Sequence, residues 1–179
     1  MAMRRSLARL AGLTLSIAAC SSSTGAPAAD DQQDAVWRTT PLVDARSGET
    51  FAINDLRGKL VAVEPMAIWC SNCQIQQLEA AVALKQLASP DIVYISLDVD
   101  PNEQPDALAK YADGREFGWR FAVAGTEVAR SLAAAFGDQI LSPPSTPLIL
   151  IGPDGSVVSQ DFGIRGSGNL VDLFGAHLP

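Results

Sequence analysis

Two cysteines separated by two residues, in the segment Trp69-Cys70-Ser71-Asn72-Cys73, constrain this chain more than any other feature. A short apolar run at residues 60–63 precedes the motif and is typical of a buried strand. This order predicts a strand-to-helix junction, with Cys70 at the start of the helix and Cys73 one turn further on. At that spacing the two thiols can close into a small disulfide.

The start of a helix favours negative charge on Cys70. Backbone N–H groups and the positive end of the helix dipole stabilise a thiolate there. We therefore predict that Cys70 is the attacking sulfur and that Cys73 resolves the intermediate. The reaction class is thiol–disulfide exchange through a mixed disulfide.

A zinc site is the main alternative for two cysteines at this spacing. It needs two further Cys or His ligands. The other candidates are Cys20, near the N-terminus, and His177, near the C-terminus. Redox chemistry is therefore favoured, and we expect neither a metal site nor a resident cofactor.

Residues 1–19 are predicted to be a signal peptide. Arg4, Arg5 and Arg9 precede a short apolar stretch that is too short to span a bilayer. The stretch ends in Ile17-Ala18-Ala19-Cys20, which resembles the lipobox of bacterial lipoproteins. That resemblance implies lipidation of Cys20, whereas an ordinary secretory signal is the alternative. The export route stays open.

Residues 20–34 are rich in small and polar side chains, which is typical of a flexible tether. We expect the tether to join the lipidated Cys20 to one folded domain at residues 35–179. A chain organised in this way lies outside the cytoplasm, anchored to the bacterial cell membrane.

The charge of the chain argues against nucleic acid as a partner. Without the leader, ten of the 13 basic residues remain against all 20 acidic ones, a formal charge of about −10. The sequence shows no cluster of Lys or Arg that could bind a polyanion or an anionic membrane face.

Strand and helix patterns alternate along residues 35–179. We expect strands at residues 35–42, 50–53, 60–63, 92–97, 120–123, 148–151 and 157–160, and helices at residues 73–87, 105–112, 126–136 and 170–178. The first two strands form a hairpin. In the helix at residues 73–87, Ile75, Leu78, Val82 and Leu87 suit one apolar face. The whole pattern predicts an α/β domain with a mixed sheet.

The chain resembles the thioredoxin superfamily in its Cys-x-x-Cys motif after a strand and in Thr146-Pro147 before a late apolar strand. The N-terminal hairpin and the lipoprotein leader make it most similar to the membrane-tethered TlpA/ResA-like branch. This resemblance implies a thioredoxin-like fold with a central mixed β-sheet, helices on both faces and an added N-terminal β-hairpin.

The resemblance also implies roles for individual residues. Cys70 and Cys73 match the redox-active disulfide. Trp69 matches a tryptophan that shields the disulfide and takes part in substrate docking. Thr146 would offer backbone groups to a bound peptide, and Pro147 matches a cis-proline that packs against the sulfurs. Pro143 and Pro144 are competing candidates for this proline, and Pro147 is preferred because the strand at residues 148–151 follows it directly.

Glu64, six residues before Cys70, matches a buried acid that assists proton transfer at the resolving thiol. Burial of a carboxyl raises its pKa, which would let it exchange a proton near neutral pH. A solvent-facing strand end is the alternative. Pro65 is unusual for a central strand, because proline cannot donate to the ladder, and it predicts a bulge or an early strand end.

These features predict a membrane-anchored protein-disulfide reductase. Because Ser71 and Asn72 are uncharged, we expect a potential nearer the roughly −270 mV of thioredoxin than the roughly −120 mV of the strongest periplasmic oxidant. The partners implied are a membrane thiol–disulfide electron donor and the disulfides of extracytoplasmic proteins. Apocytochrome c or a copper-site protein would be such a substrate.

Two other functions remain open. A Sco-like copper chaperone would need a histidine beside the cysteines, and Sco proteins have three residues between their cysteines rather than two. Asp98 and Asp100 are more typical of loop polar groups than of copper ligands. A peroxiredoxin-like peroxidase would need a hydroxyl residue between Pro65 and Cys70, and none is present.

Overall fold

The computed structural model describes residues 34–179. The predicted signal peptide, Cys20 and nearly all of the predicted tether lie outside these residues. The strands are β1 (Leu42–Val43), β2 (Thr50–Phe51), β3 (Leu60–Met66), β4 (Ile92–Asp98), β5 (Arg120–Val123), β6 (Leu148–Ile151) and β7 (Val157–Asp161). The helices are α2 (Val36–Thr39), α3 (Ser71–Leu87), α4 (Pro105–Asp113), α5 (Thr126–Phe136) and α6 (Ser167–Gly175), with short 3₁₀ helices η1 (Ile53–Leu56), η2 (Asp138–Leu141) and η3 (Pro143–Ser145).

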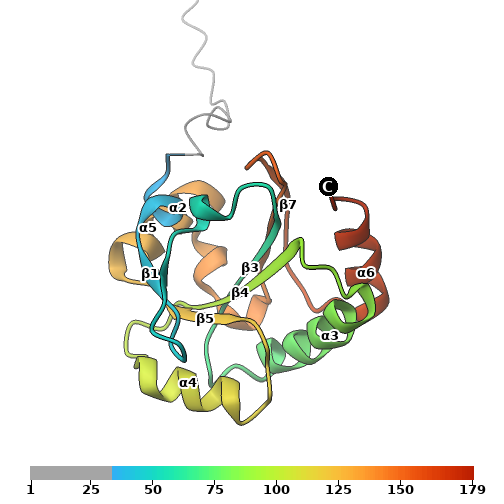
Figure 1. The fold of residues 1–179 in the computed structure, drawn as a ribbon. Helices are drawn as coiled ribbons and strands as arrows, with labels where there is room; N and C mark the ends of the chain where they lie inside the picture. The colour runs from blue at the N-terminus through green and yellow to red at the C-terminus, as the bar shows by residue number, and fades with distance from the viewer. Residues whose placement is uncertain (1–33) are drawn as a thin grey trace, which may run out of the picture.

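Five strands form one mixed sheet in the order β5-β4-β3-β6-β7 (Figure 1). β3, β4 and β5 are parallel to one another, whereas β6 runs antiparallel to β3 and β7 antiparallel to β6. The carboxyl ends of β3 and β4 therefore meet at one edge of the sheet, where α3 begins. The predicted mixed sheet is confirmed.

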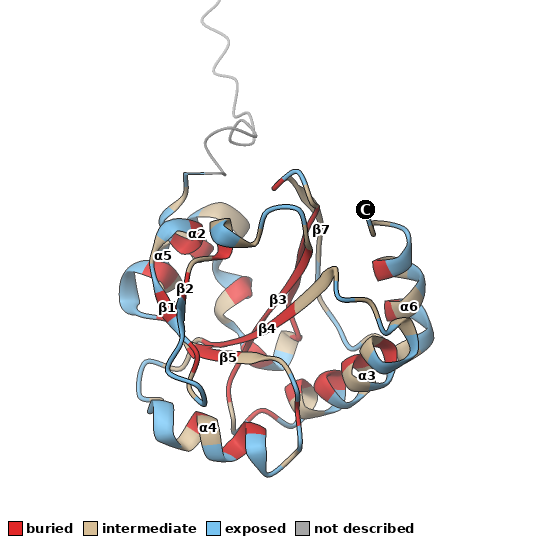
Figure 2. Ribbon diagram, viewed as in Figure 1, coloured by how far each residue is buried: buried red, intermediate tan, exposed pale blue. Residues whose placement is uncertain are grey.

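Helices cover both faces of the sheet, as predicted. On one face, Val61 and Val63 of β3 pack in a core with residues of α2 and α5. On the other face, Leu60 and Ala62 pack against α3 and α6. Because β3 and β4 are central, their residues are buried nearly throughout (Figure 2).

The N-terminal hairpin is smaller than predicted. β1 and β2 form a separate two-stranded antiparallel sheet, but residues 36–39 are the helix α2 rather than a strand. Trp37 and Arg38 are both fully buried, and a strand would send these consecutive side chains to opposite faces. In α2 the Trp37 ring packs 5.5 Å from that of Phe136, while Arg38 Nη1 donates to the carbonyl of Gly155 at 2.6 Å.

Of the four residues in the predicted apolar face of α3, Leu87 packs against the core, and the prediction is wrong for the other three. Ile75, Leu78 and Val82 are 46%, 52% and 53% exposed. The side of α3 that meets the sheet carries Cys73, Gln76, Gln77, Ala80 and Ala83. Small alanines allow a close approach to the sheet, and the two glutamines are hydrogen-bonded inside.

The described chain begins at the end of the sheet that lies away from the start of α3 (Figure 1). Arg38 of α2 contacts Gly155 in the turn between β6 and β7, and this turn lies beside the start of β3 through a hydrogen bond from Gly58 to Pro153. The cysteine motif follows the other end of β3. Within residues 34–179, no helix has the length and apolar character needed to cross a membrane.

Candidate active site

Cys70 and Cys73 form a disulfide at the start of α3, as the sequence predicts. Their Cα atoms are 5.3 Å apart, and Cys70 occupies the N-cap position. Its Sγ accepts a hydrogen bond from the backbone N–H of Cys73 at 3.1 Å. The same donor would stabilise a thiolate on Cys70 after reduction. Both cysteines are buried, at 3% and 0% exposure.

The η3 segment closes over the disulfide. Sγ of Cys73 lies 3.2 Å from the carbonyl oxygen of Pro143, an acceptor for the thiol proton once the disulfide is reduced. Asn72 Nδ2 donates to the carbonyl of Pro144 at 2.9 Å. Pro143 and Pro144 are the competing candidates for the proline beside the sulfurs, and their carbonyls make these two contacts.

The predicted cis bond before Pro147 is wrong, since residues 34–179 contain no cis peptide bond. The chain turns into β6 through Thr146, whose backbone is left-handed with φ of 45°. Its N–H donates to the carbonyl of Pro143 at 2.9 Å. Thr146 and Pro147 are both buried, and their contact with a bound peptide stays a prediction.

Trp69 lies beside the motif and is 60% exposed. Its indole Nε1 donates to Asp100 Oδ2 at 2.7 Å, which fixes the ring against the loop after β4. A large apolar side chain held in water next to a disulfide is suited to contact a partner protein. Its role in docking stays a prediction.

Glu64 is fully buried on the sheet face that carries α3. Its Oε2 accepts hydrogen bonds from the hydroxyls of Tyr94 and Ser96, each at 3.2 Å, whereas Oε1 has no hydrogen-bond partner. Burial raises the pKa of Glu64 to about 8, against the opposing effect of the nearby Gln77 amide and of the hydrogen bonds from Tyr94 and Ser96. The group can therefore hold or release a proton close to neutral pH.

Further hydrogen bonds connect Glu64 to α3 and α4. Ser96 Oγ accepts from Trp119 Nε1 at 2.9 Å and from Gln77 Nε2 at 3.4 Å. Gln77 lies one turn beyond Cys73 and its Oε1 accepts from the Tyr111 hydroxyl at 2.6 Å. Tyr111 in turn packs in one cluster with both cysteines. Sequence reasoning missed these four residues, because only the folded arrangement brings them together: Ser96 through the register of β3 and β4, and the others from α3, α4 and the segment before β5.

Pro65 does not interrupt β3. The strand continues to Met66 in unbroken parallel register with β4, so the predicted bulge or early end is wrong. β6 pairs only with Val61–Val63 of β3 and does not reach Pro65. On that side of β3, the N–H that Pro65 lacks is therefore not needed for a hydrogen bond. Glu64 keeps its inward direction as a result.

His177 lies far along α6 from the disulfide. The start of α6 contacts the first half of α3, through Arg165 with Gln76 and Ser167 with Glu79. His177 follows the other end of α6. Among residues 34–179, no three His, Cys, Asp or Glu side chains form a group that could hold a metal ion.

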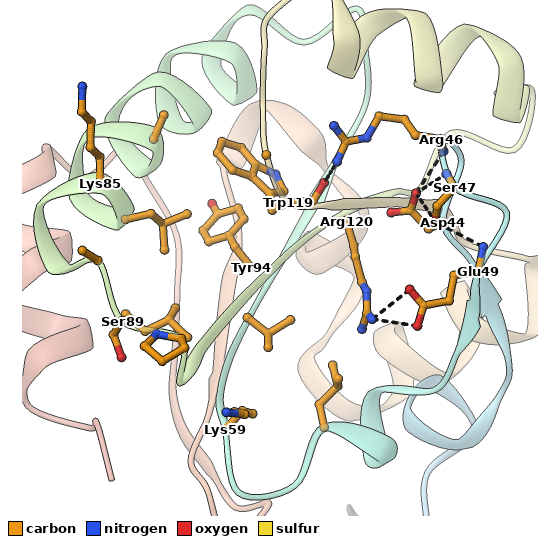
Figure 3. A pocket seen from close by; sticks show the side chains of 18 of the residues that line it. Asp44, Arg46, Ser47, Glu49, Lys59, Lys85, Ser89, Tyr94, Trp119 and Arg120 are labelled. Carbon is orange, nitrogen blue, oxygen red and sulfur yellow. Dashed lines mark hydrogen bonds and ion pairs between the residues drawn. The ribbon is translucent and has the colours of Figure 1, made fainter.

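A cavity of about 1370 Å³ lies behind the site, at the start of β4 and β5 (Figure 3). Tyr94 and Trp119, which hydrogen-bond to the Glu64–Ser96 pair, line its wall. Arg120 and Glu49 form an ion pair at 3.1 Å across its rim. Neither cysteine lines this cavity, so it is separate from the disulfide.

Solved structures with the same arrangement of strands and helices include two classes of protein, thiol:disulfide interchange proteins and Sco proteins. A thiol:disulfide interchange protein of the thioredoxin family from Chlorobium tepidum TLS has a TM-score of 0.62 at 20% identity, covering 78% of this chain and 94% of that chain. A SCO1/SenC family lipoprotein from Bacillus anthracis str. Ames has a TM-score of 0.62 at 18% identity, covering 78% and 92%. Arabidopsis thaliana ScoI with copper bound has a TM-score of 0.59 at 16% identity, covering 74% and 90%.

At these identities the likeness shows the fold, and the predicted thioredoxin-like fold is confirmed. No protein-family model matches the sequence, and no curated protein matches it.

Proposed function

We propose that this chain, a thioredoxin-like domain with a Cys70–Cys73 disulfide, is a thiol–disulfide oxidoreductase that reduces protein disulfides outside the cytoplasm. The observation that carries the proposal is the position of Cys70 at the N-cap of α3, where its Sγ accepts the N–H of Cys73. This geometry stabilises a thiolate on one sulfur and keeps the second within bonding distance.

The reaction starts from the dithiol. The Cys70 thiolate attacks a substrate disulfide, which forms a mixed disulfide and releases one substrate thiolate. Cys73 then loses its proton and attacks Sγ of Cys70, which breaks the mixed disulfide and releases the second substrate thiolate. The substrate disulfide gains two electrons, and the Cys70–Cys73 pair loses them.

Glu64 is the proposed acceptor for the Cys73 proton. Its Oε1 has no hydrogen-bond partner, and Gln77 and Ser96 link its carboxyl to the face of α3 that carries Cys73. With a pKa of about 8, the ionised fraction of Glu64, which grows as the pH approaches 8, can accept this proton, and the protonated carboxyl can return it to a leaving thiolate.

Membrane anchoring through Cys20 is part of the same proposal. The described chain starts at the end of the sheet opposite the cysteine motif, so a tether would leave the disulfide facing away from the anchor. A membrane dithiol donor would then re-reduce the protein between turnovers. The fold and the paired cysteines support this arrangement, while the anchor itself rests on the leader sequence.

A copper chaperone is the second candidate, because the similar structures include a SCO1/SenC lipoprotein and a copper-bound ScoI. Paired thiolates favour Cu(I) in any protein. His177 follows α6 at the end away from the disulfide, however, and the proposed reductase ranks first for that reason.

Turnover of a protein disulfide tests the proposal. The full chain should accelerate the reduction of insulin disulfides by dithiothreitol, and both Cys70→Ser and Cys73→Ser should abolish the acceleration. Ser71→Ala, which changes an exposed neighbour and leaves both sulfurs, should retain it. A wild-type rate no faster than dithiothreitol alone would contradict the proposed activity.

A further inference from the structure

The segment just before Cys70 is fastened to the end of β4 by a buried carboxyl. Asp98, the last residue of β4, is fully buried. Its Oδ2 accepts the backbone N–H of Ile68 at 3.2 Å, and its Oδ1 accepts that of Asp100 at 2.8 Å. One side chain thus joins the segment that leads to Cys70 with the loop that leads to α4.

The same loop holds Trp69. Asp100, whose backbone is fixed by Asp98, accepts the indole N–H of Trp69 at 2.7 Å. The N–H of Val99 also donates to the carbonyl of Met66 at 2.9 Å. Ile68 and Trp69 directly precede Cys70, which carries the attacking sulfur. Their positions are fixed by contacts with Asp98 and with the loop that follows it.

The surroundings of Asp98 favour the neutral form of its carboxyl more strongly than the surroundings of an ordinary aspartate do. Burial, together with the negative charges of Glu103 and Asp100, raises the pKa of Asp98 to about 7, against the opposing backbone hydrogen bonds from Asp100 and Ile68. Tyr111 of α4 also faces it electrostatically. The segments at residues 67–69 and 123–124 that contact Asp98 carry no charged side chain.

We propose that Asp98 is a positioning residue for disulfide exchange, whose carboxylate fixes the Ile68–Trp69 segment at the entrance to Cys70. The expected effect on catalysis rests on the proposed function. The fixing of the Ile68–Trp69 segment rests on hydrogen-bond geometry alone.

Protonation of Asp98 would weaken this attachment. In a carboxylate, both oxygens share the negative charge and each can accept an N–H strongly. In a carboxylic acid one oxygen carries the proton and the charge is lost, so both oxygens become weaker acceptors. The Trp69 segment should therefore be held firmly above about pH 7 and more loosely below it.

Trp69 emission reports this change without any assay of activity. The difference in fluorescence between wild type and Trp69→Phe isolates the Trp69 signal from Trp37 and Trp119. In the oxidised protein we expect this signal to titrate with a midpoint near pH 7. In the Asp98→Asn background the midpoint should disappear.

Glu103→Gln provides the matched variant. Removing the negative charge that raises the pKa of Asp98 should move the midpoint to lower pH while leaving both hydrogen bonds of Asp98 in place. This variant tests the assignment even if Asp98→Asn fails to fold. A midpoint that stays unchanged in Glu103→Gln, or that persists in folded Asp98→Asn, would overturn the proposal.

The rate of insulin reduction gives the second readout. Asp98→Asn should lower the rate by about tenfold above pH 7, within the roughly hundredfold loss that a small misplacement of a reacting group can cause. If wild type does not reduce insulin while the emission titrates as expected, the proposed function fails and the positioning role stands. Normal activity with no titration of Trp69 would contradict the positioning role alone.

Discussion

The hydroxyl of Tyr94 donates to Oε2 of Glu64 across 3.2 Å, from β4 to β3. Ser96, two residues further along β4, donates to the same oxygen, so both donors occupy one edge of the carboxyl. The other oxygen is left without a partner and is the atom available for a proton. The proposed proton transfer depends on this asymmetry.

Tyr94→Phe should raise the pKa of Glu64 further. The phenol stabilises the ionised carboxyl, and hydrogen bonds to charged groups contribute about 1.5–3 kcal/mol, equivalent to a rise of about one pKa unit or more. The pH dependence of insulin reduction should shift upward by that amount. Tyr111→Phe, which removes a donor to Gln77 rather than to Glu64, should give a smaller shift. Equal shifts in both variants would argue against a direct effect of Tyr94.

Glu64→Gln should slow the reaction and remove the step in its pH profile near pH 8. General acid–base catalysis contributes about 10²–10⁴-fold, and water can replace part of it here, so we expect a loss nearer the lower end. Rates measured from about pH 5 to about pH 9 provide the test. A wild-type profile in Glu64→Gln would remove the carboxyl from the mechanism.

The same substitution should alter how stability depends on pH. Folded Glu64 keeps its proton up to about pH 8, whereas the unfolded chain releases it near 4.5. The unfolded state therefore binds fewer protons between these values, and the contribution of Glu64 to stability falls as pH rises through that window. Urea unfolding should show Glu64→Gln gaining on wild type from about pH 4.5 to pH 8, by a few kcal/mol in total.

Apart from α2, the order of the main strands and helices could be predicted because their signals are local. The apolar run before Asp98 predicts β4, and Pro105 at the first turn predicts α4; both agree with the structure. The orientation of α3 could not be predicted from apolar periodicity. Its sheet-facing side is built from alanines and hydrogen-bonded glutamines such as Gln77, while Ile75 and Leu78 point to solvent.

The candidate site was predictable only in part. The Cys-x-x-Cys spacing and the six-residue offset of Glu64 are visible along the chain. The partners of Glu64 are not, because Ser96 lies opposite Glu64 only through the parallel register of β3 and β4. Trp119 lies directly before β5, and no sequence pattern links it to Ser96, to which its indole N–H donates.

Cys20→Ala should prevent fatty acid attachment. The leader sequence predicts that Cys20 becomes the lipidated N-terminus after cleavage. Growth with a labelled fatty acid, followed by membrane fractionation, should give a labelled, membrane-bound wild type and an unlabelled variant. An unlabelled and soluble wild type would contradict the anchor and leave the disulfide chemistry untouched.

Copper binding should separate the two candidate functions when Cu(II) rather than Cu(I) is used. Cu(I) binds paired thiolates in many proteins, whereas a stable Cu(II) site favours imidazole nitrogen. We expect no stable Cu(II) complex by absorption spectroscopy and no effect of His177→Ala on insulin reduction. A tight Cu(II) complex that His177→Ala abolishes, together with no reductase activity in wild type, would favour the chaperone.

The most direct test of the account is the identity of the cysteine that carries the mixed disulfide. Mass spectrometry of the reduced Cys73→Ser variant after reaction with an oxidised peptide should show a stable adduct on Cys70, formed at a pH below the roughly 8.5 at which an ordinary thiol ionises. The reduced Cys70→Ser variant should form little adduct under the same conditions, because buried Cys73 lacks the N-cap position. Adduct formation mainly on Cys73, or on neither cysteine, would contradict the mechanism.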